Sequence, residues 1–417
     1  MGKLFILCSA LLILLASYQN RKSSFSNDPG GSTSYPCTIN LADGLKNPAE
    51  LRLSEIADSI RYIVLSKDKK VAVNFIFYLA VNDSGIIAHV SQSPFLKFDI
   101  NGNFIDTIGS IGRGPAEYLP GSKFAVNPVT DEIIVYRNFM HDFIIYDADG
   151  SFVGKHPLKT GTSMESFECL SSSRFALFPV YDGREVADVS VRKNMILLGL
   201  CNQDGNLLSS IIHPVQNIPP DFVPDKYMPG YPDSRNTYFN NEVVTPCYEN
   251  TVYKINSDSI YTGFRINWGN LRVPETFEEK YYIRPSDGDI LAEIRGQFFE
   301  TPTHAFFILS YKDKYLIDYE KQSDKVKCMM LPGQGKAGFI NDIDGGQPFF
   351  PLWTNRKGDL WIDFDQAINF REQLKGNTQK EIDGADPKNK EKLVDFIRNL
   401  QPDDNPVIRI VYLKKDL

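Results

Sequence analysis

Carboxylates beside glycines mark the first positions in this 417-residue sequence that could do chemistry. Asp342 and Asp344 stand in a segment that ends in Gly345 and Gly346, and carboxylates at this spacing can bind Ca²⁺. A tight turn uses the same residue types, because Asp and Gly both favour turn conformations. We favour the turn, and a calcium site is the alternative.

A glycine-rich segment, residues 109–114, could be mistaken for a nucleotide-binding loop. Its order is Gly-x-x-Gly-x-Gly, and Pro115 with no helical pattern after it removes the helix N-terminus on which a phosphate would sit. We therefore predict a loop that joins two strands and contributes ligand contacts. The candidate ligand-binding residues of the two segments are Arg113, Glu117, Tyr118, Asp342 and Asp344.

The histidines form no metal-binding pattern, since no two of them stand at a metal-ligand spacing on one predicted element. The segment Asp147-x-Asp149-Gly150 lacks the glutamate that closes an EF-hand, because position 158 is Leu. No catalytic residue and no cofactor is identified, so the sequence favours a protein that is not an enzyme. A Ca²⁺ or Zn²⁺ site assembled from distant residues stays open. The histidines are His89, His141, His156, His213 and His304.

A loop rich in proline and aromatic residues, Pro214 to Tyr238, is a candidate interaction surface. It carries six prolines, which stiffen the backbone. Phe222, Tyr227 and Tyr231 could then serve as rigid aromatic anchors for a protein or a glycan. The alternative is a loop that folds over the protein's own surface.

A recurring hairpin indicates the architecture that must position these residues. Phe98–Phe104 and Tyr146–Phe152 share the pattern aromatic-Asp-x-x-Gly-x-Phe, and weaker copies follow at 201–207, 253–258 and 319–324. Asn-Gly and Asp-Gly supply the positive φ angles of a tight hairpin, and the flanking apolar residues alternate as in half-buried strands. The copies begin 48 to 66 residues apart, which is typical of propeller blades that carry insertions.

Strands from both ends of the chain complete the last blade. Gly358–Phe364 and Val407–Leu413 resemble the second and third strands of a blade whose fourth strand is missing, and Ile60–Leu65 can supply it. Such closure removes the open edges of the sheets. The sequence therefore predicts an all-β fold, a six-bladed β-propeller of four-stranded blades closed by an N-terminal strand.

A partly helical insertion is predicted within this last blade, over residues 365–404. Its helix begins at Asp386-Pro387, a typical start signal. We expect the helix to pack on the propeller, and a partner-binding helix is the alternative. Its apolar stripe consists of Leu393, Phe396, Ile397 and Leu400.

Several segments resemble a known group of propellers. Residues 109–120, followed by Glu132–Tyr136 and the next hairpin, resemble an NHL-type propeller repeat. From Leu51 onward the chain resembles the six-bladed β-propeller lipoproteins of Gram-negative gut anaerobes, a largely uncharacterised family, in segments such as Ser59–Tyr62 and Asp404–Pro406. The resemblance implies six blades and a location in the cell envelope, and little about chemistry.

The N-terminus is typical of an export signal. Residues 1–17 combine Lys3, an apolar stretch and small residues at the end, and residues 18–50 read as a flexible tether before the propeller at 51–417. The apolar stretch is too short to span a bilayer. Tyr18 stands where a lipoprotein carries its lipidated Cys, which argues against a lipid anchor. We expect export to the periplasm or the cell surface, with membrane association through the N-terminus if at all.

The cysteines after the signal are odd in number and widely spaced, so their disulfide pairing is left open, and we favour buried thiols. They are Cys37, Cys169, Cys201, Cys247 and Cys328. The net charge of -7 would repel a phosphate backbone, which argues against a nucleic-acid partner. We expect a monomer.

These observations favour an extracytoplasmic binding or interaction module whose partner is a protein or a glycan of the cell envelope. The blade-junction loops of a propeller meet on one face around a channel, where a ligand can bind. One alternative is a hydrolase or lyase with a metal-dependent site in that channel. Another is a structural subunit of an envelope complex.

Overall fold

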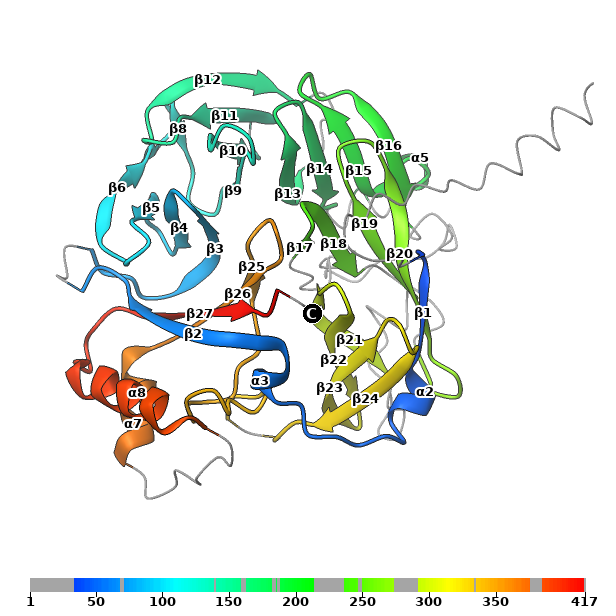
Figure 1. The fold of residues 1–417 in the computed structure, drawn as a ribbon. Coiled ribbons are helices and arrows are strands. Elements are labelled where there is room, and N and C mark those ends of the chain that lie inside the picture. The colour runs from blue at the N-terminus through cyan, green and yellow to red at the C-terminus, as the bar shows by residue number, and fades with distance from the viewer. Residues whose placement is uncertain are drawn as a thin grey trace, which may run out of the picture. The chain divides into compact units, whose positions relative to one another are not determined.

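A computed structural model describes most of the chain after the N-terminal segment. The described residues are 34–67, 71–138, 140–158, 163–181, 185, 188–213, 236–246, 250–273, 292–333, 335–375 and 385–415. Six antiparallel sheets form a ring of blades, so the chain is a six-bladed β-propeller, as the sequence predicts (Figure 1).

The first three blades follow one another along the chain, each with its innermost strand first. Blade one contains β3 (Ile76–Asn82), β4 (Gly85–Val90), β5 (Phe95–Phe98) and β6 (Phe104–Ile108). Blade two contains β9 (Lys123–Val126), β10 (Ile133–Arg137), β11 (Asp142–Tyr146) and β12 (Phe152–Pro157). Blade three contains β13 (Met164–Ser171), β14 (Arg174–Pro179), β15 (Ile196–Asn202) and β16 (Leu207–Ile212), with the short helix α5 (Val189–Arg192) between β14 and β15. A two-stranded parallel pair, β7 (Ser110–Ile111) and β8 (Glu117–Tyr118), lies between blades one and two in the sequence.

Of the remaining blades, the fourth and the sixth each incorporate a strand from the N-terminal part of the chain. Blade four contains β17 (Thr237–Phe239), β18 (Glu242–Pro246), β19 (Thr251–Ile255) and β20 (Ile260–Asn267), with β1 (Cys37–Asn40) added at its edge. Blade five contains β21 (Glu293–Glu300), β22 (His304–Tyr311), β23 (Asp313–Glu320) and β24 (Lys325–Met330). Blade six contains β25 (Trp353–Thr354), β26 (Leu360–Asp365), β27 (Val407–Leu413) and β2 (Ala57–Val64).

The recurring hairpins connect the third and fourth strands of their blades. In the first, the Asp99 carboxylate accepts hydrogen bonds from the backbone N–H groups of Asn101 and Asn103, at 2.8 and 2.9 Å. Gly102 takes a φ of 85°, which a side chain would disfavour. Asp147 plays the same part in the second hairpin. The aspartates of the repeat thus stabilise turns, as Asx residues commonly do.

The N-terminal strand closes the ring as predicted. Strand β2 pairs with β27 in antiparallel register, with Tyr62 opposite Arg409, and becomes the outermost strand of blade six. Arg409 is fully buried and donates two hydrogen bonds to Asp363 of β26, at 2.7 and 2.5 Å. It also donates to the carbonyl groups of Gln347 and Pro348, so one side chain joins two strands to the loop before blade six.

The chain before β2 departs from the expected tether. Residues 35–56, which we call the strap, include β1, the one-turn helix α2 (Leu41–Gly44) and the one-turn helix α3 (Leu53–Ile56). Strand β1 pairs in parallel with β20, because Cys37 and Ile39 turn inward and join the core there. Residues 37–50 therefore belong to the propeller. The sequence did not reveal β1 and α2, because elements of four residues each are hard to distinguish from the polar segment before them.

A buried ion cluster fixes the start of the strap between blades four and five. The carboxylate of Glu300 lies 3.0 Å from the ammonium of Lys254 and 2.7 Å from that of Lys321. Tyr35 of the strap donates a hydrogen bond to the same carboxylate. Burial acts to raise the pKa of Glu300, but the two adjacent lysines hold it below its ordinary value.

The insertion in blade six contains two helices, α7 (Ala367–Lys375) and α8 (Pro387–Asn399), which lie beside β2 and β27 in Figure 1. Asp386 caps α8 by accepting from the N–H groups of Lys388 and Asn389, at 2.8 and 3.1 Å. The apolar stripe of α8 packs inward, and the ring of Phe396 lies 5.4 Å from that of Tyr62. The helix packs on its own propeller, as expected.

Breaking the buried pair in blade six should destabilise the protein strongly. We expect Asp363→Ala to lower the free energy of unfolding by about 3–5 kcal/mol, because it leaves the Arg409 guanidinium buried without its carboxylate. Asp395→Ala is the matched control, since it removes an exposed pair with Arg398 and should cost at most about 1 kcal/mol. Urea denaturation of the three proteins measures both changes. Equal losses for the two variants would contradict this role of Arg409.

Candidate functional site

The three predicted site residues in the loop before blade two have different surroundings. Arg113 is exposed, and the carboxylate of Glu117 accepts a hydrogen bond from the N–H of Gly114 at 2.7 Å. Tyr118 is almost fully buried, stacks on Phe95 with ring centroids 4.6 Å apart, and donates to the carbonyl of Ile108 at 2.5 Å. Tyr118 therefore belongs to the core, which corrects its assignment as a ligand contact.

Asp342 and Asp344 hold the strap and β2 in place. The carboxylate of Asp342 accepts from the backbone N–H and the hydroxyl of Ser54, at 2.9 and 2.6 Å. That of Asp344 accepts from the hydroxyl of Tyr62 at 2.8 Å and from the N–H of Gly346 at 3.0 Å. Both side chains are buried and occupied by these contacts, so they build a junction. In the described part of the chain, no three His, Cys, Asp or Glu side chains are grouped to hold a metal ion.

The predicted residues do not form one site. Arg113, Glu117 and Tyr118 precede blade two, whereas Asp342 and Asp344 precede blade six and contact the strap and β2. The interaction loop with Phe222, Tyr227 and Tyr231 lies outside the described residues.

The centre of the ring contains a buried polar cluster contributed by inner strands. Glu168 of β13 accepts hydrogen bonds from the hydroxyl of Tyr238 and, at 3.2 Å, from the side-chain amide of Asn236. The guanidinium of Arg356, after β25, lies 4.4 Å from the centre of the Tyr238 ring. Burial raises the pKa of Glu168, although Tyr238 and Arg356 oppose the rise. These contacts connect blades three, four and six.

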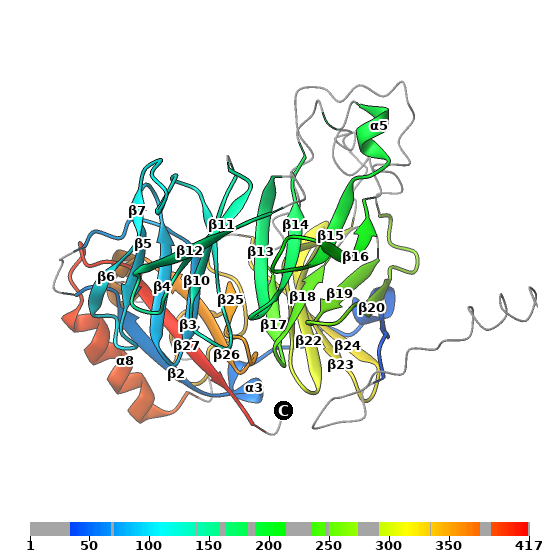
Figure 2. The same ribbon diagram turned by 90° about the horizontal axis from the view of Figure 1, so that it is seen from above.

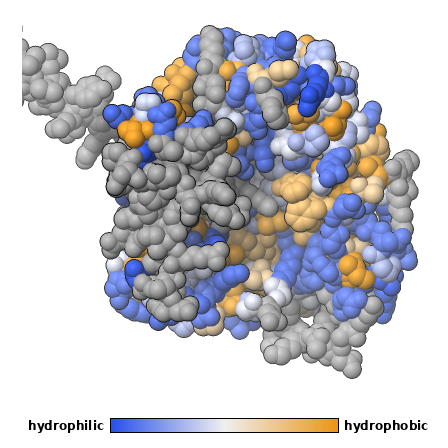
Figure 3. Space-filling model, turned by 180° about the vertical axis from the view of Figure 1, so that it is seen from behind, coloured by the Kyte–Doolittle hydropathy of each residue, from blue (hydrophilic) through white to orange (hydrophobic). Residues whose placement is uncertain are grey.

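Figures 2 and 3 distinguish the two faces of the ring. In Figure 2, α5 projects from one face and α3 lies toward the other. Figure 3 shows the face opposite to that of Figure 1, where hydrophobic residues gather near a hollow centre. Phe75 and Phe77, at the start of the inner strand β3, are each 47% exposed and contact one another with ring centroids 5.1 Å apart.

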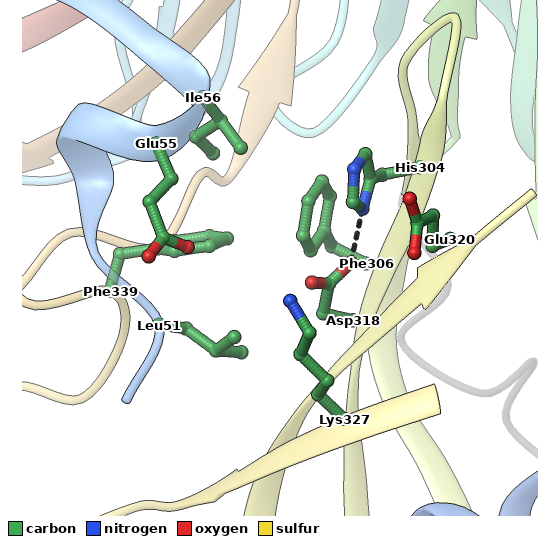
Figure 4. Close-up of a pocket in the computed structure, with 9 residues that line it drawn as sticks. All are labelled: Leu51, Glu55, Ile56, His304, Phe306, Asp318, Glu320, Lys327 and Phe339. Carbon is green, nitrogen blue, oxygen red and sulfur yellow. Dashed lines mark hydrogen bonds and ion pairs between the residues drawn. The ribbon is translucent and has the colours of Figure 1, made fainter. Parts of the chain in front are cut away.

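A pocket of about 200 Å³ lies between the strap and blade five (Figure 4). The strap contributes one wall through α3 and the residues before it, and β22, β23 and β24 contribute the other. Phe339, from the loop before blade six, completes the lining on the side of the strap. The lining residues are Leu51, Glu55, Ile56, His304, Phe306, Asp318, Glu320, Lys327 and Phe339.

A hydrogen-bonded histidine–aspartate pair lies in the wall of this pocket that blade five contributes. Nδ1 of His304 lies 2.6 Å from a carboxylate oxygen of Asp318, which is buried. In the tautomer that carries its proton on Nδ1, His304 donates this hydrogen bond and the carboxylate accepts it. The imidazole also stacks on Phe306, with ring centroids 5.6 Å apart and an interplanar angle of 6°. The ring is therefore held in one orientation (Figure 4).

Two charged groups of opposite sign line the pocket without partners of their own. Glu55 on the strap and Lys327 on β24 are exposed, and among the described residues neither side chain makes a hydrogen bond or an ion pair. Glu320 is occupied, because it accepts from the hydroxyl of Ser323 at 2.7 Å. That hydrogen bond is the main reason why the pKa of Glu320 lies below its ordinary value.

The apolar lining consists of four buried side chains, three on the side of the strap and one on blade five. Leu51 and Ile56 come from the strap, and Phe306 and Phe339 form an edge-to-face pair with ring centroids 5.2 Å apart. The pocket thus combines apolar side chains with charged groups on opposite walls. This arrangement suits a small ligand that has both a charged and an apolar part.

Sequence reasoning missed this pocket because strand register creates it. His304 lies opposite Glu320 across β22 and β23, and Phe306 lies opposite Asp318. One sequence signal was present: Asp318 interrupts the apolar run of β23, and a buried carboxylate requires a partner. The wall with Glu55 comes from the first residues of the predicted propeller, 51–56, for which the sequence predicted no strand or helix.

The described cysteines are buried and form no disulfide among the described residues, in agreement with the preferred interpretation of the sequence. They are Cys37, Cys169, Cys201 and Cys328, and Cys247 lies outside the described residues. Burial raises the pKa of the Cys169 and Cys201 thiols to about 12, so both stay protonated. No helix in the ranges given above is long and apolar enough to span a membrane.

Comparisons with known proteins address the family and the fold. The family model described as "Domain of unknown function (DUF4934)" matches residues 36–412, and no curated protein matches. A Bacteroides fragilis protein described as exported has a solved structure that is similar over 91% of this chain and 99% of its own, with 15% identity and a TM-score of 0.60. A member of the DUF4221 family from Bacteroides vulgatus covers 88% of this chain and 98% of its own, with 12% identity and a TM-score of 0.45.

The different surroundings of Asp342 and Arg113 predict a loss of stability for one substitution and almost no change for the other. We expect Asp342→Ala to lower the free energy of unfolding by about 1–3 kcal/mol, because the N–H of Ser54 loses its acceptor. Hydrogen exchange of residues 52–56 should accelerate at the same time. Arg113→Ala, at an exposed position, should change stability by no more than about 0.5 kcal/mol. Unchanged exchange in the strap of the Asp342 variant would argue against this role.

Proposed function

The chain belongs to the family described as "Domain of unknown function (DUF4934)", and from this membership and its fold we propose that it is an extracytoplasmic binding module of the cell envelope. Its ligand site is the pocket between the strap and blade five. The observation that carries the proposal is the unpartnered Glu55 and Lys327 on either side of an apolar floor.

Two observations support a location outside the cytoplasm. The first 17 residues have the composition of an export signal, and the similar Bacteroides fragilis protein is described as exported. Tyr18 still argues against a lipid anchor. The NHL-like character of the repeat and a monomeric state remain predictions from the sequence.

The pocket supports binding better than nucleophilic catalysis by a hydroxyl or a thiol. Its nine described lining residues include no hydroxyl or thiol nucleophile. The His304–Asp318 pair orients an imidazole, which serves recognition as readily as proton transfer. Rigid strands hold three of the charged groups, so a ligand meets a site that needs little reordering.

A stability screen tests the proposal. Amino acids, dipeptides and monosaccharides are each added to the wild-type protein and to a Glu55→Ala/Lys327→Ala variant. At a hundred times its dissociation constant, a ligand of the pocket should stabilise the wild type by about 2.7 kcal/mol and the variant much less.

An exposed pair elsewhere on the strap supplies the matched control. Asp43→Ala/Lys46→Ala also removes one acid and one lysine, from an exposed ion pair of 2.9 Å between α2 and the residues after it, and should respond to ligand as the wild type does. If no compound stabilises the wild type, or if every active compound stabilises the pocket variant equally, the pocket is not the ligand site.

A further inference from the structure

We propose that the pocket recognises a small zwitterion with an apolar side chain, its ammonium group beside Glu55 and its carboxylate beside Lys327. Free apolar α-amino acids belong to this chemical class. The inference rests on the proposed function, because it names the ligand of the same pocket.

The separation of charge across the cavity argues for a ligand with two charges. Figure 4 shows Glu55 on the side of the strap and the ammonium group of Lys327 on the side of blade five, with the cavity between them. Lys327 forms no ion pair within 4 Å in the described ranges, but it lies opposite Asp318 in the register of β23 and β24 and is near enough to Glu320 to help lower the pKa of that carboxyl. A ligand with a single charge would form an ion pair with one of these groups and leave the other without one.

Asp318 and Glu320 each already accept one hydrogen bond and stand on the same wall as Lys327, so Glu55 is the carboxylate of the pocket that lies apart from that lysine. Asp318 is hydrogen-bonded to Nδ1 of His304, and Glu320 accepts a hydrogen bond from the hydroxyl of Ser323. A ligand ammonium group therefore finds its free carboxylate at Glu55. A ligand carboxylate finds its free ammonium group at Lys327.

The size and lining of the cavity define the rest of the ligand. Its volume of about 200 Å³ is smaller than the roughly 300 Å³ at which pockets for drug-sized molecules begin. Leu51 and Ile56 face Phe306 across this small space, and all three side chains are buried. An aliphatic or aromatic side chain on the ligand would fill the floor and exclude water from the charged contacts.

Three related probes separate the two charged contacts. Isothermal titration calorimetry measures binding of L-leucine, of L-leucinamide, which lacks the carboxylate, and of 4-methylpentanoate, which lacks the ammonium group. We expect each truncated probe to bind about tenfold more weakly than leucine. Glycine, which lacks the apolar side chain, should also bind more weakly.

Single substitutions then assign each charge. Lys327→Met should weaken leucine about tenfold and leave leucinamide unchanged, and Glu55→Gln should weaken leucine and leave 4-methylpentanoate unchanged. Both side chains are exposed, so neither change threatens folding. Asp43→Asn/Lys46→Met is the control, and it should bind all probes as the wild type does.

The outcomes distinguish this inference from the proposed function. Equal binding of leucine and both truncated probes, or no binding of leucine at millimolar concentration, overturns the zwitterion. A monosaccharide that stabilises the wild type but not Glu55→Ala/Lys327→Ala would do the same while leaving the pocket as the ligand site. If no compound of the screen acts through the pocket, both proposals fall.

Discussion

The pairing of β2 with β27 is the constraint on which the rest of the structure depends. A ring of sheets leaves two open edges unless its last blade incorporates a strand from before its first blade. Strand β2 meets this need along its length, from Ala57 opposite Leu413 to Val64 opposite Val407. Arg409 and Asp363 reinforce the closure from inside the blade, where their charges have no access to water.

Ring closure by β2 dictates the course of the strap and so creates the pocket. Because β2 lies in blade six, the chain before it must pass blades four and five, where β1 pairs with β20 and Pro48 bridges to Cys328 of β24. Tyr35 fixes the start of this course through the buried Glu300. The strap then has little freedom where it meets blade five, and Glu55 is held over the cavity.

The sequence predicted the ring well because its signals are local or concern free strand edges. The turns at Asp99 and Asp147 share one sequence pattern because in both the aspartate carboxylate accepts hydrogen bonds from the backbone of the turn. The missing strand beside β27 predicted a partner from elsewhere in the chain, which is β2. The site residues were harder to predict. Tyr118 and Asp342 resembled contact residues, yet each has an internal partner far away in the chain, which only tertiary structure provides. The pocket depends on strand register and on the strap in the same way.

Blade five carries buried charges, which the fold requires, and exposed charges, which can change with little effect on the fold. Lys321 is buried, so its ammonium group requires Glu300, and changing either would cost stability. Lys327 lies at the edge of the same blade in contact with water, where the fold gains little from its charge. Folding therefore constrains a buried charge such as that of Lys321 closely and an exposed charge such as that of Lys327 hardly at all. A propeller can therefore keep its ring intact while the groups around the strap adapt to a ligand.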